Sequence, residues 1–192
     1  GALRGRVKLI FQPAEEGVRG ARSMVNAGVV DDVDYLIGLH LYSGWSVGNL
    51  TPGQGGFLAT TQFDAWFDGV AAHAGGSPHR GKNAMVAAAT AVLNLHAIPR
   101  HREGASRVNV GRLVAGMGRN VISPNAHLVI ETRGQTSVIN TFVYERAVRV
   151  LEGAAAMYDC KLRLREMGGA DSAFSDDVLA RRVAEVAASL DG

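Results

Sequence analysis

Two adjacent carboxylates and one histidine are the side chains of this sequence that are best placed to do chemistry. Glu15 and Glu16 follow the apolar run of residues 7–11, and His40 lies at the end of the apolar run of residues 35–41. Two such strands in one sheet would present a metal ligand and an acid or base group at the same edge. The pattern predicts half of a metallohydrolase site.

The reaction that such a site favours is amide hydrolysis. This reaction needs an activated water, a polarised carbonyl and a proton donor for the leaving amine, and paired metal ions beside a carboxylate supply all three. Local sequence leaves two simpler interpretations open. An exposed pair such as Glu15 and Glu16 is usually a solvated turn, and a histidine between apolar residues, such as His40, is usually a buried ring with a hydrogen-bond partner.

The elements that would position these groups are a strand, a helix and a second strand. The apolar run of residues 7–11 predicts the first strand, a helical apolar face follows and stops at Gly28, and residues 35–41 predict the second strand. This order is typical of a parallel β-α-β unit, in which active groups lie beyond the carboxyl ends of the strands.

The pattern changes after the stretch of residues 44–56, which is rich in glycine and contains proline. Strands are predicted at residues 59–69, 107–115, 126–133 and 160–165, and helices at residues 83–98 and 139–157. The order β-α-β-β-α-β predicts a ferredoxin-like antiparallel sheet with helices on one face. We therefore expect an α/β domain in residues 1–54, an α+β domain in residues 55–167 and a return to the first domain in residues 168–192.

The composition argues against a disulfide-bonded protein and against a membrane-spanning one. The 192 residues are 47% hydrophobic, and the single cysteine, Cys160, excludes an internal disulfide and suits a reducing compartment. The longest apolar stretch, residues 84–98, is interrupted by polar residues and is shorter than the roughly 20 residues that span a bilayer. With no export leader at the start of the sequence, we expect a cytoplasmic protein that does not bind a membrane.

The net charge of +2 is unevenly distributed, because residues 51–167 contain thirteen basic and eight acidic side chains. These basic residues are scattered and lack an aromatic stacking pattern, which argues against a nucleic-acid partner. The charge is compatible with a small acidic substrate.

Four segments together resemble successive signatures of a known family. They are Phe-Gln-Pro-Ala-Glu-Glu-Gly at residues 11–17, Gly-Leu-His at 38–40, Gly-Val-Ala-Ala-His-Ala-Gly at 69–75 and Arg-Asn-Val-Ile-Ser-Pro at 119–124. Their order and coverage of nearly the whole chain resemble the M20 metallopeptidases, in the amidohydrolase branch. The resemblance implies hydrolysis of an N-aroyl or N-acyl amino acid, with p-aminobenzoyl-glutamate favoured and indole-acetyl or N-acetyl amino acids as alternatives.

The resemblance also implies roles for the three residues identified first. Glu15 would be the general base, and Glu16 and His40 would be metal ligands. The site would hold two divalent ions, and both zinc and manganese suit carboxylate and imidazole ligands.

In the resemblance, the β-α-β-β-α-β part would be a lid and dimerisation domain. His73 would stabilise the oxyanion in the active site of the partner protomer, while Asn120 and Arg133 would hold the carboxylate of the substrate. From the residues alone, His73 is a loop residue and Arg133 a strand residue facing solvent. An unpaired edge of the sheet, at residues 107–115, or the helix of residues 83–98 would form the contact of a homodimer, and a second hydrolase subunit is a further expected partner.

The sequence also departs from the family pattern. It lacks the amino-terminal His-x-Asp metal motif, the late Gly-Glu-Asp region and the final histidine ligand, and none of His79, His96, His101 and His127 matches these. We expect part of a longer enzyme that by itself closes no two-metal site and is inactive. The alternative is a non-catalytic dimerisation or ligand-binding module.

Overall fold

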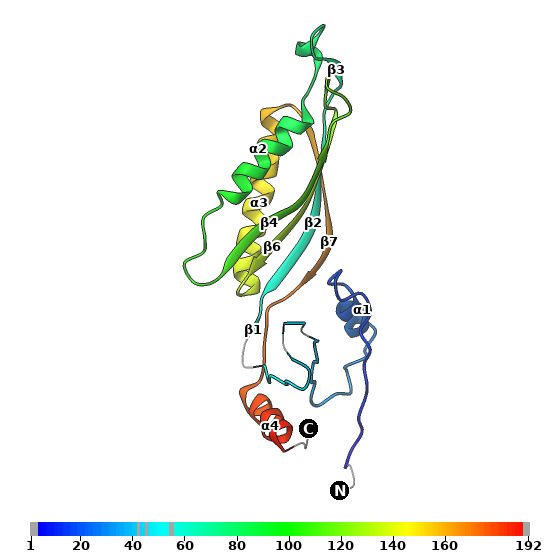
Figure 1. The fold of residues 1–192 in the computed structure, drawn as a ribbon, viewed down its shortest axis with the longest axis vertical. Coiled ribbons are helices and arrows are strands. Elements are labelled where there is room, and N and C mark those ends of the chain that lie inside the picture. Colours follow the sequence, from blue (N-terminus) through cyan, green and yellow to red (C-terminus); the bar gives the residue numbers. More distant parts are fainter. Residues whose placement is uncertain (1–3, 42, 45, 54–55, 190–192) are drawn as a thin grey trace. The chain divides into compact units, whose positions relative to one another are not determined.

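The chain divides into two compact units, Gly1–Leu41 and Tyr42–Gly192. The structure is a computed structural model that describes residues 4–41, 43–44, 46–53 and 56–189 (Figure 1). The predicted domain boundary between residues 54 and 55 lies outside the described residues.

The first unit contains one helix, α1 (Gly20–Asn26), in the place that the apolar periodicity predicts. Gly28 follows the helix with φ +76°, a left-handed conformation that glycine adopts without strain and that commonly ends helices. The predicted stop signal is therefore confirmed.

The two predicted strands that flank this helix are not found. Residues 6–11 and 35–41 form no strand, and their apolar side chains are exposed, with Leu9 at 76% and Leu39 at 87%. A strand of a parallel sheet is buried on both faces and hydrogen-bonded along its edges, so it forms only where neighbouring strands exist. The described residues of this unit supply no such neighbours, and the structure does not show the predicted parallel sheet.

The second unit is built on a four-stranded antiparallel sheet in the order β4-β6-β2-β7. Its elements are β2 (Ala59–Asp68), α2 (Ala84–His96), β4 (Ser106–Ala115), β6 (Asn125–Gly134), α3 (Ser137–Met157) and β7 (Lys161–Ala170). Both helices cover one face of the sheet (Figure 1). Element order and strand order confirm the predicted β-α-β-β-α-β topology.

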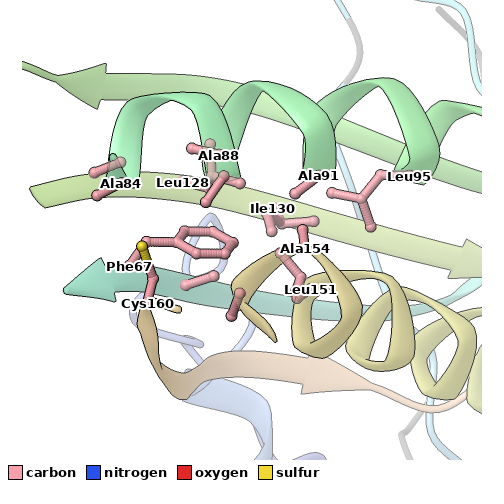
Figure 2. Packing of buried hydrophobic residues seen from close by; sticks show 14 of the residues in the cluster. Phe67, Ala84, Ala88, Ala91, Leu95, Leu128, Ile130, Leu151, Ala154 and Cys160 are labelled. Carbon is pink, nitrogen blue, oxygen red and sulfur yellow. The ribbon is translucent and has the colours of Figure 1, made fainter. Parts of the chain in front are cut away.

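The core lies between this sheet and the two helices. Phe67, Leu128 and Leu151 come from β2, β6 and α3, and each is completely buried (Figure 2). The face of α2 that meets them consists mostly of alanines, which allow the helix to pack closely. Side-chain caps begin both helices: Asn83 Oδ1 accepts from the Val86 amide at 3.3 Å, and Thr136 Oγ1 from the Ile139 amide at 3.2 Å.

Two short ribbons extend the second unit. One pairs β3 (Ala72–His73) with β5 (Val121–Ile122), and the other pairs β1 (Gly56–Phe57) with β8 (Ala173–Phe174). The first ribbon lies at the end of the sheet where β2 ends and β6 begins, and the second lies at the opposite end (Figure 1). The remaining elements are the 3-10 turn η1 (Pro78–Arg80) and helix α4 (Asp177–Ala188). In the part of the chain that the structure describes, no helix has the length and apolar character needed to cross a membrane.

Candidate active site

A strained turn holds the carboxylate pair in the first unit. Ala14 and Val18, on either side of the pair, have φ values of 52° and 50°, and the Val18 amide donates to the Glu15 carbonyl at 2.8 Å. A left-handed conformation is rare for a residue branched at Cβ such as Val18. Backbone strain of this kind concentrates at functional sites, where the surrounding structure maintains it.

The start of α1 packs directly against this turn. Gly20 is buried, and a Cβ atom built on it would lie only 1.6 Å from the carbonyl oxygen of Pro13. No side chain fits at this position unless the backbone moves. Glycine therefore allows the contact that fixes the turn relative to the helix.

Gly20→Ala is expected to loosen the turn. Forcing a methyl group into a closed contact costs about 1–3 kcal/mol, so local opening becomes roughly fivefold to a hundredfold more frequent. Hydrogen–deuterium exchange should accelerate over residues 13–20, and the full-length protein should retain less metal. Gly153→Ala is the control, because a Cβ at Gly153 meets nothing within 4 Å. Equal exchange in the two variants would show that the close contact is not what holds the turn.

His40 lies beside the carboxylate pair. Its Nε2 atom is 3.7 Å from Glu15 Oε1, and its Nδ1 atom is 2.6 Å from the carbonyl oxygen of Leu41. A carbonyl oxygen only accepts, so Nδ1 bears the proton and donates it. In the neutral ring, Nε2 then has a free lone pair, which is the form of histidine that binds a metal.

Glu16 is also exposed, but its carboxylate forms no hydrogen bond or ion pair with any residue that the structure describes. The structure thus brings His40 next to Glu15 rather than Glu16. Within the described ranges, no group of three or more histidine, cysteine, aspartate or glutamate residues could hold a metal ion. The first unit supplies a carboxylate and an imidazole in proximity, and a closed metal centre needs further ligands.

In the second unit, His73 and Asn120 lie together. His73 is the last residue of β3 and pairs with Val121 of β5, and the Ala74 amide donates to the Asn120 carbonyl at 2.9 Å. Two of the three residues that the sequence predicted to contact substrate therefore lie on the two sides of one ribbon. Two backbone amides that the sequence analysis missed also contact His73: those of Gly75 and Gly76 donate to its Nδ1 atom at 3.2 and 2.9 Å.

Arg133 lies at the other end of the sheet. It is near the end of β6, and along that strand it is about 27 Å from Asn125, at about 3.4 Å per residue. The ribbon of β3 and β5 extends from the Asn125 end (Figure 1). Arg133 Nε donates to Glu131 Oε1 at 2.6 Å, and this hydrogen bond raises the pKa of the Arg133 guanidinium above its usual value. The structure does not bring Arg133 to His73.

His127, one of the four histidines that match none of the missing family motifs, lies on β6. It lies on the sheet face away from the helices, where its Nε2 atom is 2.7 Å from Asp64 Oδ2 and its ring stacks on Trp66 with centroids 4.7 Å apart. The contacts with Asp64 and Trp66 give His127 a structural role in the sheet.

Comparisons with known proteins extend these observations. Residues 1–192 match peptidase family M20/M25/M40. The sequence is 59% identical over 170 residues to indole-3-acetyl-aspartic acid hydrolase of Enterobacter agglomerans, covering 88% of this chain and 39% of that relative. It is 56% identical over 168 residues to one of the subunits of p-aminobenzoyl-glutamate hydrolase of Escherichia coli, covering 88% of this chain and 38% of that relative.

A solved structure is also similar. The crystal structure of an aminobenzoyl-glutamate utilization protein from Klebsiella pneumoniae superimposes with a TM-score of 0.84 at 54% identity, covering 94% of this chain and 46% of that one. The chain thus spans less than half the length of each of these three relatives.

Proposed function

We propose, because the chain belongs to peptidase family M20/M25/M40, that the full-length protein is a metal-dependent amidohydrolase. Its favoured substrate is p-aminobenzoyl-glutamate, cleaved to p-aminobenzoate and glutamate. The observation that carries the proposal is the contact of Glu15 and His40, 3.7 Å apart, in a chain that matches the family over its whole length.

The names of two relatives support the substrate class. One is a hydrolase of p-aminobenzoyl-glutamate and the other of indole-3-acetyl-aspartic acid, and both compounds join an aromatic acid to an acidic amino acid through an amide. The identities, 56% and 59%, are close. Indole-3-acetyl-aspartate is therefore the second candidate substrate.

We assign Glu15 as the general base and Glu16 and His40 as metal ligands. The described groups fit a divalent ion, since His40 presents a free Nε2 lone pair and carboxylates and imidazoles both suit zinc or manganese. Two bound ions would supply an activated water and a polarised carbonyl. Glu15 is next to His40, as required of a base that takes a proton from water at the same centre and passes it to the leaving amine.

The substrate groups of the second unit require two protomers. His73 and Arg133 lie at opposite ends of one sheet, about 27 Å apart or more by the rise of an extended strand. A substrate of one aromatic ring and one amino acid is far shorter than that, so both residues serve one substrate only if they come from different protomers. We assign His73 to the partner's site as oxyanion donor, with Asn120 beside it, and Arg133 to the substrate carboxylate, for which it must release Glu131.

The dimer contact that we propose is the edge strand β4 with the neighbouring helix α2. Both elements bear exposed apolar side chains: Leu93 of α2 is 74% exposed, and Leu113 and Val114 of β4 are 42% and 48% exposed. An unpaired strand edge beside an apolar surface is a template for pairing with a second copy. Two relatives are named as subunits A and B of p-aminobenzoyl-glutamate hydrolase of Escherichia coli. We therefore propose a second hydrolase subunit as a further partner.

Light scattering of the full-length protein is expected to give the mass of a dimer. Val114→Glu should shift the mass toward the monomer, because it buries a charge at the contact. Val138→Glu is the control, since Val138 is also an exposed valine, at 79% against 48% for Val114, but lies on α3. A monomer at every concentration of the unmodified protein would rule out the dimer.

The experiment that tests the function is amide cleavage before and after metal removal. The full-length protein is expected to bind about two divalent ions per protomer and to release p-aminobenzoate from p-aminobenzoyl-glutamate. A chelator should abolish the release, and zinc or manganese should restore it. Failure of the metal-loaded protein to cleave either candidate substrate would favour the alternative of a non-catalytic module.

The proposal places the protein in the cytoplasm. Cys160 is a free, buried cysteine, and burial raises the pKa of its thiol above the usual value. Such a thiol is chemically inert, and a lone cysteine that can form no internal disulfide is compatible with a reducing compartment.

A further inference from the structure

The hydrogen bonds to His73 determine where its proton resides. The Gly76 amide donates to Nδ1 at 2.9 Å and the Gly75 amide at 3.2 Å. A backbone amide has a hydrogen and no free lone pair, so it can only donate. Nδ1 must therefore be the unprotonated acceptor. In a neutral ring the single proton is then on Nε2.

The loop that carries the two amides is fixed at several points. The Ser77 amide donates to the His73 carbonyl at 3.0 Å, and the Ala74 amide is bonded to Asn120 across the ribbon. A Cβ on Gly76 would lie 3.4 Å from Nδ1 and one on Gly75 3.6 Å from the ring, so the glycines let the backbone pass close to the imidazole. The amides are thus held in place by the ribbon and do not depend on the ring for their position.

We propose that the Gly75 and Gly76 amides are positioning groups that select the Nε2-protonated tautomer of His73 and so make Nε2–H its hydrogen-bond donor. The catalytic consequence rests on the proposed function, in which His73 donates to the oxyanion. Protonation of Nδ1 would set its hydrogen against two amide hydrogens and would break both bonds. The loop thereby supplies a neutral donor with its proton on the required nitrogen.

His40 shows the opposite arrangement within the same chain. There a backbone carbonyl accepts from Nδ1–H and leaves the lone pair on Nε2. At His73 two backbone amides bond to Nδ1 and leave the proton on Nε2. The partner of Nδ1, a carbonyl or an amide, thus decides whether the exposed nitrogen accepts or donates, which matches a ligand role for one histidine and a donor role for the other.

Nitrogen NMR of the full-length protein labelled with ¹⁵N-histidine tests the tautomer directly. The signals of His73 are assigned by their absence in His73→Gln. We expect an unprotonated Nδ1 and a protonated Nε2 at neutral pH. A proton on Nδ1, in either a neutral or a charged ring, would overturn the proposal. This readout needs no activity, so it stands apart from the test of amide cleavage.

A matched pair of variants tests the role of the amides. Gly76→Pro removes the donor with the 2.9 Å bond, whereas Gly76→Ala keeps it. We expect Gly76→Pro to give a mixture of tautomers and to lower kcat about tenfold with KM within twofold, and Gly76→Ala to keep the tautomer of the unmodified protein. An unchanged tautomer in Gly76→Pro would show that the amide does not set it. If that variant does not fold, Gly75→Pro takes its place, and the tautomer of the unmodified protein still decides the proposal.

Discussion

Glu15→Gln is expected to lower the turnover of the full-length enzyme by about two to four orders of magnitude while its metal content stays unchanged. The amide side chain keeps the size of the carboxylate but cannot accept a proton from water. If Glu15 is the base and not a ligand, only the chemical step suffers. The measurement is kcat together with the number of metal ions per protomer, determined on the same protein preparation.

Glu16→Gln is the companion variant, and it should lose metal. The comparison is informative because His40 lies within 3.7 Å of Glu15 in this structure, whereas Glu16 contacts no ionisable group that the structure describes. If Glu15→Gln releases the metal and Glu16→Gln keeps it, the two roles are assigned in the wrong order. A normal rate for Glu15→Gln would remove this residue from the mechanism.

His73→Ala is expected to raise the barrier of the reaction by about 3 kcal/mol, or roughly a hundredfold in kcat, and to leave metal affinity intact. The loss is that of one donor to the developing oxyanion. His79→Ala is the matched control, because His79 is an exposed histidine in η1, on the same loop. Steady-state kinetics and metal titration of both variants separate a catalytic loss from a general disturbance of the loop.

Mixed dimers show whether His73 acts on the partner's site. A protomer with His73→Ala and one with Glu15→Gln are each impaired alone. If His73 acts across the dimer, one of the two sites in the mixed dimer receives an intact Glu15 from one protomer and an intact His73 from the other, and activity returns. Verified mixed dimers without recovered activity would mean that His73 serves its own protomer, which the distance to Arg133 argues against.

The fold of the second unit could be predicted from the sequence because its signals are local. Alternating apolar residues mark β4 and β6, an alanine-rich run marks α2, and a helical apolar stripe marks α3. The prediction of strands at residues 6–11 and 35–41 was wrong because such strands depend on non-local contacts. A fully buried parallel strand is determined by its neighbours, and a run of apolar residues does not reveal whether those neighbours are at hand.

The parts of the candidate site that consist of distinctive side chains could be predicted from the sequence. The sequence placed a carboxylate and His40 together, and the structure brings His40 to Glu15 within the same unit. It assigned Asn120 and Arg133 together to the substrate carboxylate, but within one protomer Asn120 lies beside His73 on the ribbon of β3 and β5, and Arg133 lies near the other end of β6. The amides of Gly75 and Gly76 were missed because every residue but proline has such a group, and only the path of the backbone gives it a role.

At the ribbon of β1 and β8, the chain enters and leaves the β-α-β-β-α-β part at the same place. Its first and last strands are neighbours, with Thr60 opposite Ala170, and the segments that lead in and out are paired at Phe57 and Ala173. A part with adjacent ends can be inserted into a surface loop of a host protein, or removed from it, without stretching the host backbone. We therefore expect that residues 56–174 can be transplanted or exchanged between relatives by gene fusion. The two junctions would lie at the ribbon of β1 and β8.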